Sequence, residues 1–71
     1  MVDIGKRVRE LRRERELTIT ELADHAGLTR NAVSRIELGS RTPSSTTVDK
    51  LAQALEVEPG VLFEGPKAVA R

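Results

Sequence analysis

Two arginines and an asparagine within a stretch of six residues carry side chains suited to recognising nucleic-acid bases: Arg30, Asn31 and Arg35. A guanidinium can donate two hydrogen bonds to O6 and N7 of guanine, and a carboxamide can pair with N6 and N7 of adenine. Either arginine can instead contact only a phosphate, and this alternative stays open. The candidate chemistry is therefore guanine recognition by Arg30 or Arg35 and adenine recognition by Asn31.

The apolar residues around this stretch determine which way the polar side chains point. Val33 and Ile36 mark the inward side of a helix over residues 30–38, which Thr29 caps and Gly39 ends. At about 100° per residue, the opposite side forms a strip that points away from the core. Starting beside Arg30, this strip holds Asn31, Ser34, Arg35 and Leu38.

The whole chain predicts five helices and no strand, which gives an all-α domain over residues 1–65 and a short, disordered tail over residues 66–71. Apolar residues at helical spacing place the first helix over residues 3–15. The second helix begins at Thr18, where Glu21 can complete a capping box. With the segment described above as the third helix, a helix-turn-helix would lie between the second and third helices.

Two more helices are predicted after a loop over residues 40–45. Apolar residues recur with helical spacing over residues 48–55 and define the fourth helix. Pro59 suits the first turn of a brief fifth helix. In that helix we expect Leu62 and Phe63 to close the core.

Composition limits the classes of protein and partner. The 71 residues make one small domain, and with no cysteine and one histidine we expect no disulfide and no zinc site. No apolar run approaches the roughly 20 residues of a membrane span, and no signal peptide is evident, so we expect a cytoplasmic protein. Phe63 is the only aromatic residue, so a nucleic-acid partner is expected to be double-stranded. Nothing resembles a catalytic dyad or a phosphate-cradling loop, and we predict no enzyme, cofactor or small-molecule ligand.

Residues 19–38 have the pattern of two helices that cross at a steep angle. Ala23 and Ala26 are small enough to let the helices approach closely, and Gly27 permits a sharp turn. Leu28 can fill the space beneath that turn. Over twenty residues, this pattern favours a helix-turn-helix over an ordinary helical hairpin.

The chain resembles the phage-repressor/Cro-like helix-turn-helix family, also called the Xre family. The resembling segments are IGKRVRELR, LTITELADHAGLTRNAVSRIELG, RTPSSTTVDKLAQAL and VEPGVLF, which run from Ile4 to Phe63. The resemblance implies a sequence-specific regulator of transcription, in most cases a repressor, whose third helix enters the major groove of DNA. It also implies that Arg30, Asn31 and Arg35 read bases, with Ser34 adjacent to them.

Backbone contacts are expected from helix N-termini and from the loop after the third helix, because free amides and the helix dipole favour a phosphate. The net charge is only +1, but Arg30, Arg35 and Arg41 form a basic group with Glu37 as its only local acid. The resemblance implies that Glu37 forms an ion pair with Arg12 that holds the third helix. The expected backbone contacts are Thr18, Thr20, Thr29, Ser40, Arg41, Thr42 and Ser44.

Three residues depart from the family pattern. Ile19 stands where relatives often have a glutamine, which removes one expected phosphate contact. Ser45 replaces a leucine at the start of the fourth helix, which is expected to fray. Leu38 replaces a polar or basic residue, and it can touch a thymine methyl group or a sugar, cover a partner surface, or be an isolated exposed leucine. The basic residues of the first helix are expected to face solvent: Lys6, Arg7, Arg9 and Arg13.

One such domain contacts too few base pairs to be specific in a genome, and the family resemblance implies that the protein acts as a homodimer on a palindromic operator. Pro59 and Val61 are the candidate dimer interface. The alternative function is an antitoxin-like or scaffold module whose main partner is another protein. A single basic strip without a long acidic or apolar tail favours the regulator.

Overall fold

The computed structural model describes residues 3–63 of the protein, and each α-helix in that range begins at a side chain that caps its first turn. The capping oxygen accepts a hydrogen bond from the amide three residues further on. Thr18 and Glu21 form the reciprocal capping box that the sequence predicts. The elements are α1 (Ile4–Glu14, cap Asp3), α2 (Ile19–Ala26, cap Thr18), α3 (Arg30–Leu38, cap Thr29), α4 (Ser45–Leu55, cap Ser44) and η1 (Pro59–Phe63).

The all-α prediction is confirmed, since no strand occurs between residues 3 and 63. The count of five helices is wrong, because η1 is a 3₁₀-helix and not a fifth α-helix. The amide of Val61 bonds to the carbonyl of Glu58, three residues back, at 2.9 Å, and five residues are too few to make an α-helix favourable. The longest helices of this range have 11 residues, and none is long and apolar enough to cross a membrane. The predicted tail, residues 66–71, lies outside the described residues.

Phe63 does not close the core, contrary to the sequence prediction. Leu62 is fully buried, whereas Phe63 is 52% exposed. A 3₁₀-helix has about three residues per turn, so neighbouring side chains point about 120° apart. Only one of the two adjacent residues can therefore face the core.

The first turn of α4 is formed, although Ser45 stands where a leucine was expected. Ser44 supplies the cap, and its Oγ accepts a hydrogen bond from the amide of Thr47 at 3.2 Å. A good N-cap stabilises a helix start by about 1 kcal/mol. This cap supports the start of α4 at Ser45 without a leucine at that position.

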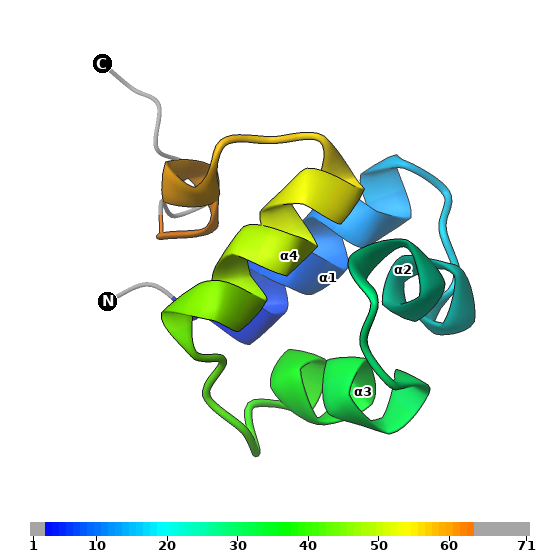
Figure 1. Ribbon diagram of the computed structural model, residues 1–71, viewed down its shortest axis with the longest axis horizontal. Coiled ribbons are helices and arrows are strands. Elements are labelled where there is room, and N and C mark those ends of the chain that lie inside the picture. Colours follow the sequence, from blue (N-terminus) through cyan, green and yellow to red (C-terminus); the bar gives the residue numbers. More distant parts are fainter. Residues whose placement is uncertain (1–2, 64–71) are drawn as a thin grey trace.

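The helix α3 lies along one edge of the molecule, the lower edge in Figure 1, and packs mainly against α1 and α2, while α4 packs against α2 and η1. Each helix contributes its inward side to one shared core. The side of α3 that faces away from α1 and α2 is left uncovered within the described residues. The buried core residues are Val8, Leu11, Leu22, Ala23, Ala26, Val33, Ile36, Val48, Leu51, Ala52, Leu55 and Leu62.

The crossing of α2 and α3 depends on small residues and a left-handed turn. Ala23 and Ala26 are 2% and 6% exposed, so both lie in the contact between helices. Gly27 has φ of 69°, and its amide bonds back to α2. The amide of Leu28 then bonds to the carbonyl of Ala23 at 2.9 Å. This turn sets the direction in which α3 leaves α2.

Candidate nucleic-acid interface

The outward side of α3 presents the polar strip that the sequence predicts. The helix buries Val33 and Ile36 together with Ala32, which the sequence analysis did not assign to the core. The strip consists of exposed Arg30, Asn31, Arg35 and Leu38 and of half-buried Ser34. No polar side chain of the strip makes a hydrogen bond within residues 3–63, so these groups remain available to a ligand.

Two shallow grooves connect α3 with its neighbours. The first runs along the start of α2 and is lined by Ile19, Arg30, Asn31 and Ser34. The second lies between the start of α1 and the loop after α3, where Arg41 and Thr42 contribute to its wall. The start of α2 and the loop after α3 therefore both border α3. In the groove at the start of α2, Ile19 presents an apolar side chain where the family often has a glutamine.

Three of the predicted phosphate contacts are helix N-caps. Thr18 and Thr29 each accept an amide hydrogen bond through Oγ1 at 3.0 Å. This bond occupies a lone pair of the oxygen and leaves the hydroxyl proton able to donate to a phosphate. In Ser44, by contrast, the hydroxyl donates to Oγ1 of Thr47 at 3.1 Å. The two threonines are therefore better placed than Ser44 to donate a hydrogen bond outward.

Positive charge collects on α3 and on the loop that follows it. Arg30, Arg35 and Arg41 are all exposed. Between residues 29 and 48 the only acid is Glu37, and its side chain is 5% exposed because it pairs with Arg12. This segment therefore presents three guanidinium groups and no exposed carboxylate. The remaining predicted backbone contacts, Thr20, Ser40 and Thr42, are exposed, and Oγ of Ser40 donates to the carbonyl of Arg35 at 3.3 Å.

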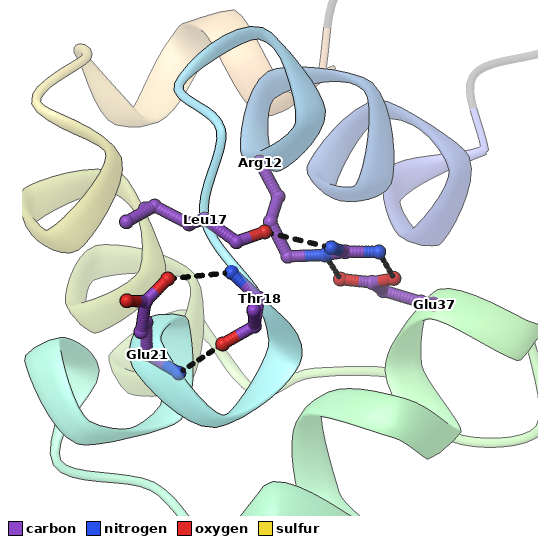
Figure 2. Close-up of polar contacts among 5 residues, drawn as sticks. All are labelled: Arg12, Leu17, Thr18, Glu21 and Glu37. Carbon is purple, nitrogen blue, oxygen red and sulfur yellow. Dashed lines mark hydrogen bonds and ion pairs between the residues drawn. The ribbon is translucent and has the colours of Figure 1, made fainter.

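A bidentate ion pair joins α1 to the last turn of α3 (Figure 2). Nε of Arg12 lies 2.8 Å from Oε2 of Glu37, and Nη2 lies 3.1 Å from Oε1. Nη1 of Arg12 donates to the carbonyl of Leu17 at 2.8 Å. The two side chains are only 14% and 5% exposed. Parallel hydrogen bonds between a guanidinium and a carboxylate fix orientation as well as distance, so this pair holds α3 in register with α1.

Gly5 is a positioning residue that the sequence analysis missed. A Cβ atom at Gly5 would lie 2.0 Å from the carbonyl oxygen of Ile36, far inside van der Waals contact. The start of α1 can therefore approach the end of α3 only because residue 5 has no side chain. The signal in the sequence was a glycine inside a helical pattern, which is unfavourable unless a close backbone approach requires it.

The candidate dimer residues lie on η1, which α1 holds in place. Pro59 is exposed and Val61 is half-buried. Nε of Arg7 donates to the carbonyl of Val61 at 3.4 Å, and Nη1 lies 3.4 Å from Oε1 of Glu10. The side chain of Arg7 is only 18% exposed, so the expectation that it faces solvent is wrong. The reason is that η1 folds back onto α1 and offers a carbonyl to its guanidinium.

The pattern of the helix-turn-helix family matches residues 8–62, which is most of the chain. The protein therefore belongs to the helix-turn-helix family, in its phage-repressor/Cro-like (Xre) branch.

Similar proteins include regulators of transcription. The HTH-type transcriptional repressor RghR of Bacillus subtilis (strain 168) is 43% identical over 58 residues, which cover 80% of this chain and 43% of RghR. The antitoxin PezA of Streptococcus pneumoniae serotype 4 is 37% identical over 54 residues, which cover 76% of this chain and 34% of PezA. The chain thus spans less than half the length of either relative.

A solved structure of similar length has the same fold. The restriction-modification controller protein C.AhdI from Aeromonas hydrophila is 44% identical to this chain, with a TM-score of 0.84. The match covers 87% of this chain and 94% of C.AhdI. Nearly the whole of C.AhdI therefore has a counterpart in the present structure.

Proposed function

We propose that this protein binds double-stranded DNA sequence-specifically and regulates transcription, most simply as a repressor that covers a promoter. The observation that carries the proposal is the outward strip of α3, which presents candidate base-reading side chains, two of them arginines, next to exposed Arg41 and with no exposed acid between residues 29 and 48. A helix with these properties fits the major groove, where each base pair presents a distinct pattern of donors and acceptors. Membership of the helix-turn-helix family supports the same function.

The strip and its borders have different roles in this proposal. Arg30, Asn31, Ser34 and Arg35 contact base edges. The Thr18 amide already bonds to Oε1 of Glu21 at 2.9 Å, so the phosphate at the start of α2 binds the amides of Ile19 and Thr20 and the exposed hydroxyl of Thr20. In the loop after α3, Arg41 and its neighbours bind phosphates of the opposite DNA strand. The other proposed backbone contacts are Thr18, Thr29, Ser40, Thr42 and Ser44.

The active form in this proposal is a homodimer on a palindrome. One domain reads only a few base pairs, and a two-fold dimer doubles that number with half-sites about one helical turn apart. Pro59 and Val61 on η1 are the proposed contact between subunits.

The test is selection from a library of random duplexes at two salt concentrations, followed by sequencing of the bound DNA. The expected result is a palindromic consensus whose binding weakens steeply as salt rises, because each neutralised phosphate releases a counterion. Weak binding without any consensus would contradict the proposed function.

A substitution then separates base reading from phosphate binding. Arg35→Ala is expected to lower affinity for the consensus by about 10- to 100-fold and to abolish the base preference at one position of each half-site. Arg13→Ala is the matched control, since it removes the same charge from an exposed position of α1. Uniformly weaker binding with an unchanged consensus would assign Arg35 to a phosphate instead.

A second candidate function is an antitoxin-like module whose main partner is another protein. The observation that favours it is the 37% identity with the antitoxin PezA. In that case the protein would purify with a stable protein partner, and the free chain would bind duplexes without sequence preference. Selection of a consensus by the free chain would contradict this second function.

A further inference from the structure

The most exposed large apolar side chain between residues 3 and 63 lies on the base-reading strip. Leu38 is 78% exposed and is the last residue of α3. Seven residues separate it from Asn31, which amounts to two turns, so the two side chains lie only about 20° apart around the helix axis. Leu38 is therefore placed on the middle of the strip, directly opposite the buried side of α3.

The surroundings of Leu38 identify what covers it. One turn before it on α3 stand Ser34 and Arg35, and Glu37, the adjacent acid, is held in the ion pair with Arg12. A surface of exposed arginines with no free carboxylate is complementary to DNA and not to another basic surface. In the major groove, the only apolar group on a base edge is the 5-methyl group of thymine.

The distance along α3 also suits this contact. Seven residues of α-helix span about 10.5 Å, close to three base-pair steps of about 3.4 Å each. A thymine near Leu38 would thus lie within about three base pairs of the base that Asn31 contacts. The strip then reads one half-site with polar groups at one end and an apolar group at the other.

We propose that Leu38 is a specificity-determining residue that recognises a thymine methyl group in the half-site. This inference rests on the proposed function and adds one position to its recognition code. The selected consensus must then contain a thymine within about three base pairs of the position that changes when Asn31 is replaced by alanine.

The test removes the methyl group from the DNA. Each thymine of one half-site is replaced in turn by deoxyuridine, which lacks only the 5-methyl group, and dissociation constants are measured. Replacement at one position is expected to raise the dissociation constant about fourfold, which corresponds to the free energy of burying one methyl-sized group. Leu38→Ala should abolish the difference between thymine and uracil at that position, while Leu38→Met, which keeps an apolar side chain, should retain it.

The control and the fold check come from the same chain. Phe63→Ala removes the other large apolar side chain that is exposed among residues 3–63, on η1, and should leave the ratio between thymine and uracil duplexes unchanged. Leu38→Ala should unfold at the same temperature as the parent protein, since its side chain is exposed.

Two outcomes would overturn the inference, and both are distinguishable from failure of the proposed function. The first is a consensus without a thymine in the stated range. The second is an equal thymine-to-uracil ratio for Leu38→Ala and the parent: if the variant binds every duplex more weakly, Leu38 contacts the DNA backbone, and if its DNA binding is unchanged, a protein surface covers Leu38. In both cases a consensus still exists, whereas failure of the proposed function would yield none.

Discussion

The ion pair between Arg12 and Glu37 gives a quantitative prediction for the stability of the fold. Glu37→Gln keeps the size of the side chain but turns one oxygen into an NH₂ group, which then faces the donors of Arg12. The guanidinium, 14% exposed, would keep its bond to the Leu17 carbonyl but lose its counter-charge. Breaking one side of a buried pair destabilises a protein by about 3–5 kcal/mol, and we expect about 3 kcal/mol because Arg12 retains one bond and some solvent.

Such a loss is large for a domain of this size. A chain of 71 residues has a free energy of unfolding of roughly 4–11 kcal/mol. A change of about 3 kcal/mol corresponds to a fall in Tm of roughly 12–24 °C. Urea and thermal unfolding, followed by circular dichroism, measure both quantities.

The chain provides a matched control and a second test. Glu10→Gln makes the same substitution in the Arg7–Glu10 pair, where the one contact is 3.4 Å and Glu10 is 32% exposed, so we expect a loss below about 1 kcal/mol. The double variant Arg12→Met with Glu37→Leu removes both charges and should lie within about 1 kcal/mol of the parent. Equal losses for Glu37→Gln and Glu10→Gln would refute the reasoning that burial makes the first pair important.

Three further substitutions and one control variant test other features of the fold by the same unfolding measurements. Gly5→Ala should destabilise the protein by about 1–3 kcal/mol, because the added methyl group would collide with the Ile36 carbonyl. Gly60→Ala is the control: no atom lies within 4 Å of the added methyl group, so its effect should be neutral or slightly stabilising. Similar values for the two variants would contradict the close approach at Gly5. Glu56→Gly should raise stability by up to about 1 kcal/mol, because residue 56 has φ of 60°, and a clear loss would show that no strain is stored there. Thr18→Ala should lower it by about 1 kcal/mol through loss of the capping box, and an unchanged midpoint would contradict that role.

Local features of the fold could be predicted from the sequence because their causes are local. Thr18 and Glu21 lie three residues apart, and the capping box that they form fixes the start of α2. Likewise, Thr29 and Gly39 bound α3 at the residues expected. The spacing of Val33 and Ile36 was sufficient to predict which side of α3 faces outward.

Other features depend on contacts between residues distant in sequence. Gly5 lies against the carbonyl of Ile36, and although a glycine inside a helical pattern signals a close approach, the sequence does not show which carbonyl it meets. The geometry of η1 is set by packing on α1 and α4, and this decides that Leu62 and not Phe63 turns inward. The partner of Arg12 was predicted from the family resemblance, because spacing alone does not pair it with Glu37.

Within residues 3–63, the polar side chains of the α3 strip make no hydrogen bond, which has a consequence for evolution and for engineering. Since Arg30, Asn31 and Arg35 are exposed and hold nothing together, they can be exchanged without unfolding the domain. Gly5 and Arg12, on the other side of α3, keep the helix in its place whatever the strip contains. Under the proposed function, a lineage would change the DNA sequence that it recognises by a few substitutions in this strip, and the same exchange would graft a new recognition sequence onto an unchanged scaffold.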